Sequence, residues 1–145
     1  MSYSILRNEK HKRSNASKSY MHNERKNKHY SNTNIDLNKT HLNYHLKQPL
    51  GRYENEFDRL KKENNLKGQI KETSVIVCEL LMTSDKDFFD KIGENETKRY
   101  FKECYNFVSQ YKNLGEENII SAVVHLDEFT SFYDKVASSF KLLNL

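Results

Sequence analysis

Residues 73–82, TSVIVCELLM, give the strongest strand signal in the chain, because the stretch is apolar and rich in β-branched side chains between polar neighbours. We therefore predict a buried strand there. A second stretch of the same character, IISAVVHL at 119–126, predicts a second strand. These two strands are expected to form the centre of a small sheet, against which the remaining elements pack.

The segment between these strands is helical in pattern. Thr83 or Ser84 is predicted to cap a helix that begins DKDFFDKI, where acidic side chains favour the first turn. Gly93-Glu94-Asn95 is expected to break this helix, and a second helix is predicted over about 95–112, with a broad aromatic face.

The first 66 residues predict shorter elements. We expect a strand over 2–8, a helix over about 16–28 with Ser14 or Ser17 as its N-cap, a polar loop over 29–40, an extended segment over 41–46 and a charged amphipathic helix over 52–66. Helices that alternate with strands in this way indicate an α/β or α+β architecture, in which helices pack on a small sheet.

Composition restricts the class of protein. The chain has 145 residues, 36% of them hydrophobic, and its mean hydropathy is −0.92. That length suits one small domain. No apolar run approaches the ~20 residues that span a bilayer, and the first residues lack the apolar core of a secretory signal. Cys78 and Cys104 lie outside any metal-binding spacing, so we expect a reducing, cytoplasmic setting.

Charge is distributed unevenly along the chain. Residues 1–50 carry ten basic and three acidic side chains, a net charge of +7, whereas residues 51–145 carry 14 basic and 17 acidic ones, a net charge of −3. A basic half of this kind can bind nucleic acid, because Lys and Arg that neutralise phosphates release condensed counterions. The alternative is a solvated basic arm without a partner.

Three clusters contain residue types that do chemistry. His22-Asn23-Glu24-Arg25 places an imidazole and a guanidinium on one helix face, where they could act on a phosphate or simply be solvated. His41-Leu42-Asn43-Tyr44-His45 is interpreted as an edge strand with exposed imidazoles. His125-Leu126-Asp127-Glu128 follows a buried strand, a common position for metal ligands or an acid–base pair.

Taken together, these clusters resemble one family. The succession MSYS-I-x-R, H-N-E-R, T-H-L-N-Y, L-x-T-S-D-K-D-F-F-D and V-H-L-D-E is similar to the N-terminal part of the plasmid mobilisation and recombination (Mob/Pre) relaxases of the MobV type, which belong to the His-hydrophobic-His endonucleases. The resemblance covers residues 1–128. It implies a small antiparallel sheet with packed helices and a protein that nicks one strand of plasmid DNA at an origin of transfer.

The resemblance also implies a role for individual residues. The family's nucleophile, which becomes covalently bonded to the 5′ phosphate, matches His22, and Arg25 would neutralise that phosphate. Glu128 joins them in the implied catalytic group. Tyr44 and Tyr111 match tyrosines that contact DNA. His125 matches one of three histidines that hold Mn²⁺ or Mg²⁺, which would polarise the scissile phosphate.

The chain departs from the family after Glu128. The family continues towards Pro-His-x-His, whereas this sequence reads Phe129-Thr130-Ser131-Phe132-Tyr133-Asp134 and contains no later histidine. We interpret residues 1–128 as the N-terminal part of a relaxase domain and 129–145 as a divergent tail, for which a frameshift is one hypothesis. Nicking is therefore expected to be impaired. The alternatives are a catalytically inactive DNA-binding module and a non-functional gene remnant.

Loss of the family's next strand has a structural implication. Without a partner, the strand over 119–126 would form an exposed apolar sheet edge, and such edges pair with other chains. On this basis the sequence predicts marginal stability and self-association through that edge.

Overall fold

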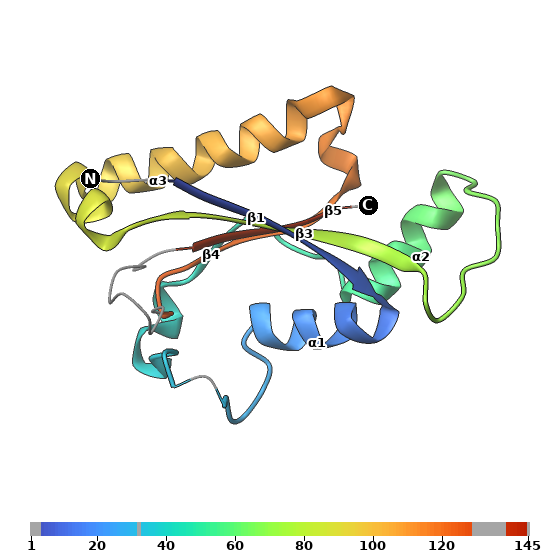
Figure 1. Cartoon of the computed structure of the whole chain (residues 1–145), viewed down its shortest axis with the longest axis horizontal. Coiled ribbons are helices and arrows are strands. Elements are labelled where there is room, and N and C mark those ends of the chain that lie inside the picture. The colour runs from blue at the N-terminus through green and yellow to red at the C-terminus, as the bar shows by residue number, and fades with distance from the viewer. Residues whose placement is uncertain (1–3, 32, 129–138, 145) are drawn as a thin grey trace.

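The computed structural model describes residues 4–31, 33–128 and the backbone of 139–144. It contains a five-stranded antiparallel sheet with α3 on one face and α1 and α2 on the other (Figure 1). The elements are β1 (Ser4–Lys12), α1 (Arg13–Asn23), β2 (Tyr44–Lys47), α2 (Tyr53–Glu63), β3 (Val75–Ser84), α3 (Lys86–Gln110), β4 (Ile119–His125) and β5 (Ser139–Asn144), with short 3₁₀ helices at Leu37–Leu42, Tyr111–Asn113 and Glu116–Asn118. The predicted fold class is confirmed.

The order of strands across the sheet is β1-β3-β5-β4-β2. Strand β5, the last in the chain, pairs with β3 on one side and with β4 on the other. The prediction that 119–126 forms an exposed edge is therefore wrong, because β4 has a neighbour on each side. Within the described residues the edges are β1 and β2, so the reason for expecting marginal stability and self-association at β4 no longer applies.

An aromatic core fills the space between α3 and the sheet. Phe101 stacks on Phe89, with ring centroids 5.3 Å apart, and Tyr105 and Val108 extend the buried face along the helix. Ala122 and Val124 of β4 contribute the opposing side. These are the alternating residues of a strand whose two faces are both covered.

A smaller core lies under α1 and α2. Ala16 of α1 and Tyr53, Phe57 and Leu60 of α2 pack with Val77 and other β-branched residues of β3 and β4. The two helices therefore cover the sheet face opposite α3. Because the ends of α1 and β4 lie on this face, the clusters at 22–25 and 125–128 can meet there.

Most predicted elements are present, but several ends differ. The strand over 2–8 extends to Lys12, so α1 starts at Arg13 and neither Ser14 nor Ser17 is its N-cap. Strand β3 continues through Thr83 and Ser84, and the side chain of Asp85 caps α3 by accepting a hydrogen bond of 2.8 Å from Phe88 N. The predicted break is confirmed at Gly93, with φ 82° and ψ 174°.

Within the described ranges, no helix is both long and apolar enough to cross a membrane.

Candidate functional site: a cluster of histidine, arginine and carboxylates

The first half of the site is the C-terminal end of α1. The helix ends at Asn23, and Arg25 takes a left-handed conformation with φ 52°, which is uncommon for a residue with a side chain. Lys26 N then donates to Met21 O at 2.9 Å, and Arg25 Nη1 donates to His22 O at 2.7 Å. This turn directs the Arg25 side chain back across the helix end.

The second half is the turn after β4. Arg25 donates from Nε to Asp127 Oδ2 at 2.9 Å and from Nη2 to Asp127 Oδ1 at 2.8 Å, a bidentate ion pair in which the arginine side chain is 5% exposed and the carboxylate 0%. Burial alone would raise the pKa of Asp127, but the hydrogen bonds from Arg25 and Thr40 outweigh burial and lower that pKa. Asp127 is therefore ionised and fixes the guanidinium.

Glu128 Oε2 is the atom on which the predicted catalytic residues His22 and Arg25 and the predicted metal ligand His125 converge. Arg25 Nη2 donates to it at 3.0 Å, and His22 Nε2 and His125 Nδ1 each lie 3.8 Å from it. The structure thus brings together residues about 100 positions apart in the chain. His22 is the more accessible imidazole, with its side chain 31% exposed, whereas His125 is fully buried.

The tautomer of His125 follows from its contacts. Its Nε2 lies 2.8 Å from the backbone carbonyl of Asn23, and because a carbonyl only accepts, Nε2 must carry the hydrogen. In the neutral ring Nδ1 then keeps its lone pair, and this is the atom that faces Glu128. The same bond ties the end of β4 to the end of α1.

Three hydrogen bonds between the segment before β2 and residues 126–127 also hold the turn after β4 in place. Asp36 N donates to Asp127 O at 2.7 Å, and Thr40 Oγ1 donates to the Asp127 carboxylate at 2.7 Å. Asn43 Oδ1 accepts from Leu126 N, also at 2.7 Å. The cluster 41–45 therefore contributes Asn43 to the architecture of the site, a contribution that the alternating pattern did not predict.

Glu24, the third residue of the H-N-E-R motif, has a structural role that the sequence did not reveal. Its carboxylate contacts His45 Nε2 at 2.6 Å and accepts hydrogen bonds from Tyr53 at 2.7 Å and Ser121 at 3.3 Å. Burial opposes the charge, but the bonds from His45 and Tyr53 outweigh it and lower the pKa of Glu24. The ionised carboxylate thereby ties α1 to β2, α2 and β4.

The two tyrosines predicted to contact DNA lie away from this cluster. Tyr44 is half-buried and packs against the aromatic core on the α3 face, where burial raises its pKa. Tyr111, 53% exposed, follows α3 and its ring lies 5.7 Å from that of Phe107. The structure does not bring either tyrosine to the α1 face, where His22 lies.

The residues around Glu128 fit the implied metal only in part. His125 is the single imidazole of the expected ligand set, and the sequence contains no histidine after it. Arg25 already places a positive charge 3.0 Å from Glu128 Oε2. Among the described residues, a second group is formed by Glu9, His11 and Glu79, whose ligand atoms all lie within 4.8 Å of one another. Sequence reasoning missed this second group.

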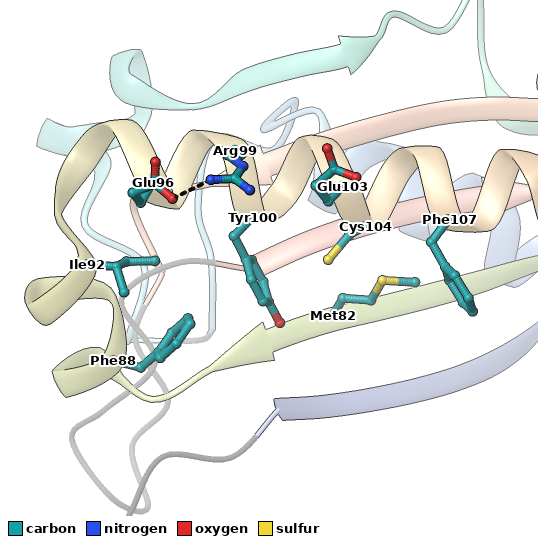
Figure 2. Close-up of a pocket in the computed structure, with 9 residues that line it drawn as sticks. All are labelled: Met82, Phe88, Ile92, Glu96, Arg99, Tyr100, Glu103, Cys104 and Phe107. Carbon is teal, nitrogen blue, oxygen red and sulfur yellow. Dashed lines mark hydrogen bonds and ion pairs between the residues drawn. The ribbon is translucent and has the colours of Figure 1, made fainter.

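Several cavities lie on the α3 face of the sheet. One of about 470 Å³ lies between α3 and β3, and Figure 2 shows Phe88, Tyr100, Met82 and Phe107 along it. Its ionic pair, Arg99 with Glu96, sits at the helix surface. This cavity contains none of the predicted site residues, which meet around Glu128 instead.

Comparison with known proteins identifies the family of this chain. The family described as plasmid recombination enzyme matches residues 1–135. The plasmid recombination enzymes of Streptococcus agalactiae and Lactiplantibacillus plantarum are each 38% identical to this chain over 90% of its length. The chain spans only about a quarter to a third of these relatives, 26% and 36% respectively.

Solved structures of relaxase domains are also similar to this chain. The chain is similar to the MobM relaxase domain bound to pMV158 oriT DNA, a Mn-bound structure, with a TM-score of 0.84, 33% identity and coverage of 98% of this chain and 69% of that one. A second Mn-bound structure of that complex gives a TM-score of 0.82. With the sequence match over residues 1–135, these likenesses show that the chain belongs to the Mob/Pre plasmid recombination enzyme family.

Proposed function

We propose that this chain binds plasmid DNA at an origin of transfer and contains the nucleophile half of a strand-nicking site. The observation that carries the proposal is the convergence of His22, Arg25 and His125 on Glu128 Oε2. The similar MobM relaxase domains are bound to oriT DNA, which supports plasmid DNA as the partner.

In the proposed reaction, His22 attacks phosphorus through the lone pair of a ring nitrogen. A nitrogen–phosphorus bond forms and the bond from phosphorus to the 3′ oxygen breaks, which leaves a 5′ phosphoramidate on the protein and a 3′ hydroxyl on the DNA after that oxygen gains a proton. Glu128, 3.8 Å from His22 Nε2, is suited to accept the imidazole proton. Arg25 is the candidate for neutralising phosphate charge, and Asp127 holds its guanidinium in one orientation.

A divalent cation in the family's site would polarise the phosphate oxygens. The Mn-bound MobM structures support such a cation in the family. In this chain His125, with its Nδ1 towards Glu128, would supply one ligand, and the two histidines of Pro-His-x-His are missing from the sequence. We therefore expect weak metal binding there and weak nicking.

Binding of DNA without nicking is the second candidate function. It is favoured by the ion pair between Arg25 and Glu128, which neutralises the carboxylate without a metal, and by the net charge of +7 over residues 1–50. A module of this kind would occupy its origin and leave the DNA intact.

A nicking assay separates the two functions. Supercoiled plasmid that carries the DNA flanking the gene would be incubated with the protein at micromolar and at millimolar Mn²⁺. We expect a shift in gel mobility in both conditions, no nicked product at the lower concentration and at most a trace at the higher one.

A variant in which the missing Pro-His-x-His motif is restored serves as the positive control for nicking. The family motif Pro-His-x-His is restored at its usual spacing by the substitutions Ser131→Pro, Phe132→His and Asp134→His. This triple variant is expected to gain nicking, which His22→Ala should abolish and His29→Ala should not. Robust nicking by the unmodified chain would contradict the predicted impairment, and failure to bind any flanking DNA would contradict both functions.

A further inference from the structure

A group of three potential ligands lies on β1 and β3, apart from the residues around Glu128. Glu9 and Glu79 are direct partners across the antiparallel pair, and His11 follows Glu9 by two residues. Side chains two positions apart on a strand share one face, and directly opposed residues share it too. The register therefore brings one imidazole and two carboxylates together on a rigid part of the sheet.

The contacts show that this face is the one covered by α1. His11 Nε2 lies 3.3 Å from Glu79 Oε2, and Asn23 donates to that same oxygen at 3.1 Å. Ser19 donates to it as well. These helix side chains hold the Glu79 carboxylate in one orientation, as outer partners do for metal ligands.

The group borders an open cavity. His11 and Glu79 are buried, at 7% and 8% exposure, whereas Glu9 is exposed at the mouth. The cavity, of about 360 Å³, is lined by these three residues and by Asn15, Lys18, Ser19, His22 and Asn23. A hydrated cation therefore has a path from solvent to the ligand atoms, and it would enter the cavity that His22 lines.

The charges of Glu9 and Glu79 favour the binding of a cation. Two carboxylates directly opposed across strands repel each other, and a cation bound between them would relieve that repulsion. One nitrogen and two oxygen ligands suit Mn²⁺, Zn²⁺ or another divalent first-row metal, whose remaining coordination positions water would fill.

We propose that Glu9, His11 and Glu79 form a divalent transition-metal site in this chain, distinct from the residues around His125 and Glu128. Neither the sequence motifs nor the proposed nicking reaction requires this site. The proposal stands whether or not the chain nicks DNA.

The test is direct metal binding to the purified full chain. Mn²⁺ would be titrated and the free ion followed by electron paramagnetic resonance, and Co²⁺ would report nitrogen and oxygen ligation through its visible absorption. His11→Asn and Glu9→Gln should each weaken binding at least about tenfold, since loss of an outer partner alone costs that much in many sites. Because Glu9 is exposed, Glu9→Gln removes a ligand without disturbing the core.

The controls define what would overturn the proposal. His29→Asn removes an exposed histidine outside the group and should leave the affinity for Mn²⁺ unchanged. Glu128→Gln should also leave it within about twofold. The proposal is wrong if the unmodified chain binds no Mn²⁺ or Co²⁺, if His11→Asn and Glu9→Gln bind as well as the parent, or if Glu128→Gln alone abolishes binding.

Discussion

Arg25 shows at the scale of one residue how the site depends on a buried ion pair. Its guanidinium is 5% exposed and its bidentate partner Asp127 is fully buried. Arg25→Ala would leave that carboxylate uncompensated, so we expect a loss of about 3–5 kcal/mol in the free energy of unfolding. Urea denaturation followed by circular dichroism would measure it.

The matched control is a surface pair. Arg99 and Glu96 lie 3.1 Å apart on α3, with side chains 71% and 55% exposed. Arg99→Ala should cost no more than about 0.5 kcal/mol, because solvent screens exposed pairs. Equal losses for the two variants would mean that the Arg25–Asp127 pair is not what stabilises the end of α1.

Asp127 also predicts how stability changes with pH. Hydrogen bonds from Arg25 and Thr40 lower its pKa in the folded chain despite burial, whereas the unfolded chain keeps an ordinary value of about 3.9. A lowered folded pKa stabilises the fold above the unfolded pKa, and this contribution is lost as the pH falls through the folded pKa. We therefore expect the free energy of unfolding to drop below about pH 4.

The variant Asp127→Asn tests this assignment. It should be less stable than the parent at pH 7, and its stability should depend less on pH in the acid range. Denaturation measured at about six pH values between pH 2 and 7 would show how steeply the free energy of unfolding changes with pH in the parent and in the variant. Parallel curves for parent and variant would assign the acid sensitivity to other carboxylates.

At the scale of elements, Gly93 determines the path of α3. Its φ of 82° and ψ of 174° interrupt the helix between Lys86 and Gln110, and a Cβ there would meet no atom within 4 Å. Gly93→Ala therefore introduces backbone strain without a steric clash, and we expect a cost of about 1–2 kcal/mol.

Gly51 is the control for that substitution. It has no positive φ, and a Cβ there also meets nothing within 4 Å. Gly51→Ala should be neutral or stabilising by up to about 1 kcal/mol, because it only restricts the unfolded chain. Thermal unfolding of the two variants measures the contrast, and equal shifts would exclude strain at Gly93 as the cause.

Local patterns predicted the elements that have strong periodicity. The strands at 73–82 and 119–126, the helix over 52–66 and the break at Gly93 all correspond to observed features. The extension of β1 to Lys12 was missed because its pairing with β3, rather than its own polar sequence, defines it. Strand β5 was missed because the departure from the family motif suggested a tail without a partner.

The site was predictable only as far as the family motifs contained its residues. The family resemblance placed His22, Arg25 and Glu128 in one catalytic group, and the structure brings them together, while their roles stay predictions. Nothing in the local sequence indicated that Arg25 would pair with Asp127. The group at Glu9, His11 and Glu79 depends on the register between two strands, which is a long-range property that no short motif records.

At the scale of the whole molecule, the uneven charge predicts how DNA binding responds to salt. The net charge of +7 over residues 1–50 should make phosphate contacts a large part of the affinity. On duplex DNA we expect the logarithm of the association constant to fall linearly with the logarithm of salt concentration, by roughly 0.9 per neutralised phosphate. Fluorescence anisotropy at several salt concentrations would measure the slope.

Two pairs of variants show where those phosphates bind. Lys26→Gln and Lys28→Gln change exposed lysines just beyond the end of α1, whereas Lys67→Gln and Lys71→Gln change exposed lysines after α2. The first pair should reduce the slope by about one unit for each phosphate that the variant no longer neutralises, and the second pair should not. An affinity that does not depend on salt would refute the electrostatic interpretation.

The central position of β5 has a consequence for how the chain folds during synthesis. Until residues 139–144 leave the ribosome, β1 with β3 and β4 with β2 can form only two separate ribbons, since β5 joins them. Closure then requires pairing between segments far apart in the chain, from Cys78 to Asn144. Such high contact order slows folding, so we expect the nascent chain to expose one unpaired edge of β3 and one of β4 until β5 inserts between them.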